Sequence, residues 1–210
     1  MNKLINVVIV VSCVVLAGSY FLPAEVSWSP FDAWRGYYVG NEFVKDFNMA
    51  LVETFPFGVG VVVLAALALS RRPTASVAVF VVFAVTWAVS LAWEVARIVR
   101  NPHYQFRMLW LMLAVSIVPV VIVVSILFLR KYQRMTTALI LGAVLAVSSV
   151  LQQSCLIAWY LLEDKLLLNV GSVTGMAGAA VLFVGLLVKK EACGRLRDSK
   201  QQDTEPIVNT

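Results

Sequence analysis

Charged residues are scarce in this chain. Only 14% of its 210 residues are charged, whereas a soluble domain carries about 25%. Hydrophobic residues make up 60% of the sequence, and a soluble fold of this length could not bury so much apolar surface, because its surface is too large for its volume. The composition therefore excludes an ordinary soluble domain and predicts a single membrane-embedded unit.

Cysteine and histidine are also sparse. Cys13 and Cys155 lie within apolar stretches and Cys193 lies in a polar tail; none forms a C-x-x-C pair, so neither a disulfide framework nor a thiol redox motif is indicated. The only histidine is His103, which we expect to be a solvated loop residue. A metal or haem site needs several such ligands, so we expect no metal and no cofactor. Phosphate-binding glycine motifs, G-x-S-x-G and H-E-x-x-H are absent as well.

Long apolar runs fill most of the chain instead. A helix needs roughly 20 apolar residues to cross the hydrocarbon core, and isolated strands cannot cross it because their backbone groups would go unpaired. We therefore predict an all-α, polytopic bundle of six transmembrane helices, at residues 4–22, 49–69, 76–96, 108–129, 137–161 and 166–188. The polar residues 189–210 are predicted to form a disordered tail after the single domain 1–188.

The first apolar run has a second interpretation. Residues 1–22 resemble a signal peptide, which would be cleaved. The run is longer than the usual apolar core of a signal peptide, so a retained helix is favoured. The rest of the topology is the same in both cases.

Lysine and arginine are distributed unevenly around these runs. With the N-terminus in the cytoplasm, eleven of the 17 basic residues lie inside and six outside. This bias predicts a multi-pass protein of the plasma (inner) membrane with both termini cytoplasmic. The net charge of +5 then reflects membrane orientation, and no nucleic-acid partner is expected.

The longest predicted outer loop, residues 23–48, is rich in aromatic residues. Ser29, Pro30 and Asp32 are typical of a helix start. The sequence predicts a short interfacial helix there, anchored in the headgroup layer by aromatic side chains. Its anchors would be Trp28, Phe31, Trp34 and Tyr38. The alternative function for this segment is a lid over a site in the bundle.

Arginines follow the third predicted span on the outer side, against the usual charge rule. Arg97, Arg100 and Arg107 all lie there, and Glu94 can pair with Arg97 one helical turn away. The simplest interpretation is an interfacial ion pair with arginines on lipid phosphates. The alternative is that the arginines hold a phosphate or carboxylate ligand.

Polar residues also occur inside the predicted spans, where they are costly and usually face protein or water. Nearly all lie in the outer halves, while the inner halves are almost plain hydrocarbon. We therefore predict one outward-opening ligand site beneath the aromatic loop. Its candidate residues are Glu53, Glu94, Arg97, Arg100, Arg107, Gln152, Gln153 and Asn169.

Small residues recur along the last predicted span. Gly171, Gly175 and Gly178 lie on a face that lets another helix approach closely. This pattern indicates helix packing and carries no specific chemistry.

Three functions from different classes fit these features. The favoured hypothesis is a non-enzymatic accessory or assembly subunit, which would contact a membrane protein partner or a second copy of itself through the glycine face and the outer loop. An alternative is a binding or transport protein for a small polar or anionic molecule or a lipid headgroup. A second alternative is a lipid-modifying enzyme that uses Glu53 or Glu94 as acid or base.

Overall fold

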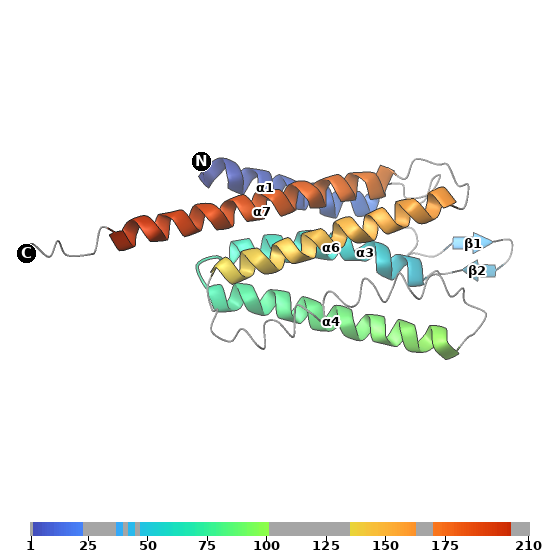
Figure 1. The fold of residues 1–210 in the computed structure, drawn as a ribbon. Coiled ribbons are helices and arrows are strands. Elements are labelled where there is room, and N and C mark those ends of the chain that lie inside the picture. The colour runs from blue at the N-terminus through green and yellow to red at the C-terminus, as the bar shows by residue number, and fades with distance from the viewer. Residues whose placement is uncertain are drawn as a thin grey trace, which may run out of the picture.

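The computed structural model is a bundle of long helices (Figure 1). It describes residues 2–22, 37–39, 42–44, 47–100, 135–162 and 170–202. The elements in chain order are α1 (Asn2–Gly18), the 3-10 helix η1 (Ser19–Phe21), β1 (Tyr37–Val39), β2 (Glu42–Val44), α3 (Phe47–Ala68), α4 (Pro73–Arg100), α6 (Met135–Leu162) and α7 (Val170–Gln202).

Four of the described helices are long and apolar enough to cross a membrane. These segments are Lys3–Phe21, Pro73–Ser90, Met135–Cys155 and Val170–Arg195. Helix α3 coincides with the predicted span 49–69, and Thr54–Ala68 is its described apolar segment. The predicted span 108–129 lies outside the described residues. The structure thus supports a helical membrane protein with four candidate spans, and six are not confirmed.

The helix directions place several ends together (Figure 1). The start of α1, the turn from α3 to α4, the start of α6 and the end of α7 all lie at one end of the bundle. We call this the basic end, because it carries Lys3, Arg71, Arg72, Lys189, Lys190 and Arg195. Helices α4 and α6 therefore run in the same direction, and α3 and α7 run against them.

The loop between α1 and α3, which the sequence predicts to be an outer loop, contains a hairpin where an interfacial helix was predicted. Strands β1 and β2 pair antiparallel, with Val39 opposite Glu42. Tyr38 lies in β1, so the helix is not confirmed and is wrong for residues 37–39. Tyrosine and valine favour strands, and the intervening sequence Gly40-Asn41 is typical of a two-residue hairpin connection. The other three predicted anchors, Trp28, Phe31 and Trp34, lie outside the described residues.

The C-terminal tail begins as helix and not as the predicted disordered segment. Helix α7 continues to Gln202 without a break; residues 203–210 lie outside the described residues. Extending an existing helix costs far less than starting a new one, and lysine, glutamate, alanine, arginine and leucine after residue 188 are good helix formers. Glu191 and Arg195 add an i,i+4 ion pair at 3.9 Å.

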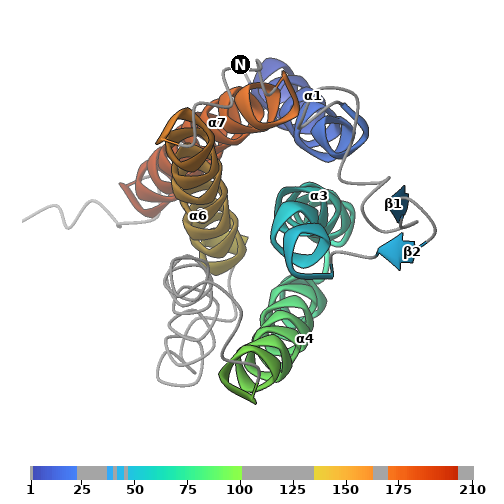
Figure 2. The ribbon, with the colours of Figure 1, turned by 90° about the vertical axis from the view of Figure 1, so that its right-hand side faces the viewer.

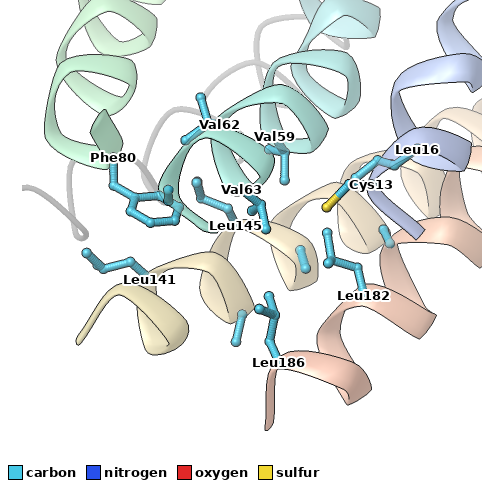
Figure 3. Packing of buried hydrophobic residues seen from close by; sticks show 14 of the residues in the cluster. Cys13, Leu16, Val59, Val62, Val63, Phe80, Leu141, Leu145, Leu182 and Leu186 are labelled. Carbon is cyan, nitrogen blue, oxygen red and sulfur yellow. The ribbon is translucent and has the colours of Figure 1, made fainter. Parts of the chain in front are cut away.

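An apolar core joins the helices in the interior of the bundle (Figure 3). Helices α3, α4 and α7 meet α6 around Gly142: a Cβ there would lie 3.1 Å from Leu186, 3.5 Å from Val63 and 3.6 Å from Phe80. The labelled members of this core are Cys13, Leu16, Val59, Val62, Val63, Phe80, Leu141, Leu145, Leu182 and Leu186.

Glycines bring α1 close to its two neighbours. A Cβ on Gly178 of α7 would lie 3.2 Å from the backbone nitrogen of Leu16, and one on Gly60 of α3 would lie 2.7 Å from the carbonyl oxygen of Cys13. The small-residue face of α7 therefore packs against α1 within the chain (Figure 2). Gly171 of the same face is buried.

Candidate functional site

Two amide side chains are buried inside the bundle on α6. Gln152 is 1% exposed and Gln153 is 4% exposed. Amides taken out of water are costly unless they are hydrogen-bonded. These two residues are therefore the natural starting point for a site, and both belong to the predicted ligand-binding set.

The end of α1 and the start of α7 meet α6 at this position. A Cβ on Gly175 would lie 2.9 Å from Ser19 Oγ and 3.7 Å from Gln153 Cδ. Gly175 thus leaves room for a serine hydroxyl and an amide to approach the same point. Ser19 Oγ donates a hydrogen bond to the carbonyl oxygen of Leu16 at 2.7 Å, and its own lone pairs remain available as acceptors.

Helices α3 and α4 contribute aromatic rings about one helical turn nearer the basic end, at the height of Ser149. The contacts at Gly142 place Val63 and Phe80 level with it. At a rise of 1.5 Å per residue, Phe55, Trp87 and Ser149 all lie roughly 10–12 Å farther from the basic end. The ring centroids of Phe55 and Trp87 are 4.9 Å apart.

We call this section of the bundle the polar layer. It consists of Ser19, Trp87, Ser149, Gln152, Gln153 and Ser172, all of them buried. Three of its atoms have no hydrogen-bond partner within the part of the chain that the structure describes: Trp87 Nε1, Ser149 Oγ and Gln153 Oε1. Such atoms are rare in folded proteins, and each calls for an explanation.

For four of the other predicted site residues, the structure describes the backbone only. Glu53 lies in the second turn of α3, and Glu94, Arg97 and Arg100 lie in the last two turns of α4, so their backbones are at the end opposite the basic end (Figure 1). Their side chains are not among the described ones. Arg107 and Asn169 lie outside the described residues altogether. That all eight line one site stays a prediction.

Four members of the polar layer are outside the site set predicted from sequence: Ser19, Trp87, Ser149 and Ser172. Trp87 follows Phe80 and Ala84 at helical spacing, so it was indistinguishable from a core aromatic. Ser149 precedes Gln153 by one helical turn, and this spacing is the signal that could have identified it. Ser19 lies at the end of an apolar run, and its proximity to Gly175 depends on how α1 packs against α7.

Comparison with known proteins adds no assignment. The sequence matches no protein-family model, no curated protein and no solved structure. In the described ranges no group of three or more His, Cys, Asp or Glu is placed to hold a metal ion. Function therefore has to be inferred from the residues of this chain.

Proposed function

We propose that this protein is a non-enzymatic accessory or assembly subunit of a complex in the plasma membrane. Its partner would bind the end of α7. The supporting observation is the length of this helix, which has 33 residues, whereas roughly 20 suffice to cross the hydrocarbon core. The red end of α7 extends well past the ends of the other helices (Figure 1).

The projecting part, which we call the α7 extension, comprises residues 189–202. Basic residues outnumber acidic ones within it: Lys189, Lys190, Arg195, Arg197 and Lys200 against Glu191 and Asp198. A patch of one sign attracts and orients a partner of the opposite sign. We therefore propose an acidic protein surface on the cytoplasmic side as its partner.

The energetics of the extension also favour a partner. Helix ends fray, and most of the stability of a helix in a protein comes from tertiary packing. The ion pair within it is highly exposed, with Arg195 at 83% and Glu191 at 72%, and exposed pairs contribute little to stability. Binding to a partner surface would add the packing that this end of the helix lacks at Gly194, where no atom lies within 4 Å of the Cβ position.

The glycine face is a weaker candidate for partner contacts than the sequence indicated. Gly175 and Gly178 approach Ser19 and Leu16 of the same chain. A partner helix would have to displace α1 to use this face. At Gly194, within the α7 extension, no atom lies within 4 Å of the Cβ position. The outer loop remains the second proposed contact.

Purification in a mild detergent tests this function. The full-length protein is expected to bring down a stoichiometric partner chain, and a variant ending after residue 195 is expected to lose it. Arg195→Glu, Arg197→Glu and Lys200→Glu together should weaken capture. The matched control, Arg71→Glu with Arg72→Glu, changes charge at the same end of the bundle and should retain the partner. A full-length protein that purifies with no second chain would contradict the proposal.

A further inference from the structure

The atoms of the polar layer that lack partners form a second feature, independent of α7. Gln153 Oε1 is buried and accepts no hydrogen bond from a described residue. An unmade hydrogen bond in the interior costs the full desolvation of the group. Native structures generally offset this cost with a bound water or ligand.

Ser149 differs from the other serines in the helices. Ser148 donates to the carbonyl oxygen of Val144 at 2.8 Å, and Ser154 donates to that of Val150 at the same distance. This bond to the preceding turn is the usual solution for a serine in an apolar helix. The Ser149 hydroxyl is fully buried and has no partner among the described residues.

The two side chains lie on the same face of α6. They are separated by four residues, which places their Cβ atoms roughly 6 Å apart. A single small molecule bound beside this face would contact both Ser149 Oγ and Gln153 Oε1. The Ser19 hydroxyl approaches Gln153 across Gly175 and adds a third polar group on the α1 side.

We propose that the polar layer binds a small uncharged molecule that carries O–H or N–H donors. A donor is required because Gln153 Oε1 can only accept a hydrogen bond, whereas Ser149 Oγ can both donate and accept. The molecule is uncharged because the described side chains of the layer are serine, glutamine and tryptophan. None of them would neutralise an ion in a low-dielectric interior. Water and a small neutral solute such as an amide or a polyol share this chemistry.

Thermal unfolding of the detergent-solubilised protein tests the proposal. The decisive result is whether the Tm of two polar-layer variants falls or does not fall relative to the wild type. If the layer is dry, Ser149→Ala and Gln153→Leu each remove an unpaired buried group and leave Tm unchanged or higher. If a molecule is bound, both variants lose its hydrogen bonds, and we expect Tm to fall by roughly 2 °C or more.

Ser148→Ala is the matched control for the serine variant. It removes a buried hydroxyl that bonds only its own helix and gains the same helix propensity. The proposal requires Ser149→Ala to lower Tm more than Ser148→Ala does, and it requires Gln153→Leu to lower Tm as well. It is overturned if either layer variant is as stable as the wild type, or if the two serine variants lose the same amount.

Added probes separate the two sources of the bound molecule. Acetamide and glycerol serve as neutral probes, and acetate serves as the charged one. A rise in Tm with a neutral probe that is absent in Gln153→Leu identifies the layer as a solute site. No rise with any probe, together with the losses above, identifies bound water. A larger rise with acetate than with the neutral probes would overturn the uncharged ligand.

Discussion

The half of the bundle nearer the basic end is built differently from the half beyond it. In the first, leucine, valine and phenylalanine fill the interior (Figure 3), and the buried Ser76 hydroxyl of α4 donates to the carbonyl oxygen of Ala66 in α3 at 2.9 Å. In the second, buried amides and hydroxyls share the interior with Leu16, Phe55 and Trp87, and three polar atoms lack partners among the described residues. The first half therefore maintains the fold, and the second is where a bound molecule would be held.

Core truncation should give the largest effect. Leu145 is fully buried in the apolar half, so Leu145→Ala is expected to destabilise the protein by about 2–5 kcal/mol through lost burial and the cavity left behind. Leu151 on the same helix is 57% exposed, and Leu151→Ala is the control, with a loss below about 1 kcal/mol. Reversible unfolding in mixed micelles measures both. Equal losses would show that the half near Leu145 is not packed as described.

Close helix approach should give the next largest effect. A Cβ on Gly60 would meet the backbone of α1 at 2.7 Å, so Gly60→Ala forces the helices apart and should cost about 1–3 kcal/mol. Gly194 has no atom within 4 Å of its Cβ position, and Gly194→Ala should be neutral or stabilising because alanine favours helix. If Gly60→Ala were also stabilising, α1 would not contact α3 in this way.

The hydrogen bond between α4 and α3 should give a smaller effect. Ser76→Ala removes the donor to the Ala66 carbonyl, and we expect a loss of about 1 kcal/mol. The same unfolding assay measures it, with Ser90→Ala as the control, since the Ser90 hydroxyl is exposed and bonds only its own helix. If Ser76→Ala left the stability unchanged, the paired Ser76 hydroxyl would no longer distinguish the apolar half from the half with unpaired polar atoms.

Apolar length predicted the helices well and their surroundings poorly. The runs at 4–22, 76–96, 137–161 and 166–188 coincide with helices long enough to span a membrane, because hydropathy and the backbone hydrogen-bond requirement act locally. The sequence predicted that Gln153 faces the interior, because an amide side chain exposed to lipid is energetically costly. That Gly175 receives Ser19 and Gln153 depends on how α1, α6 and α7 pack together, which one segment does not determine.

Composition failed for the tail for a physical reason. Residues 189–202 look disordered by charge alone, yet they follow a helix that is already formed, so their helix propensity decides the outcome. The sequence did not predict the hairpin, because the spacing of the aromatic residues fits one face of a helix with 3.6 residues per turn. Residues Tyr37–Val39 instead follow their strand preference next to the turn-forming sequence Gly40-Asn41.

Cysteine labelling of intact cells tests the membrane orientation that the proposed function requires. Gly40→Cys and Lys200→Cys would each be placed in a chain carrying Cys155→Ser and Cys193→Ser, because those two cysteines are exposed and Cys13 is buried. A membrane-impermeant maleimide should label position 40 in intact cells and position 200 only after permeabilisation. This result would place the basic end in the cytoplasm and the polar layer towards the outside. Labelling of both positions from the same side, or in the reverse order, would contradict the account.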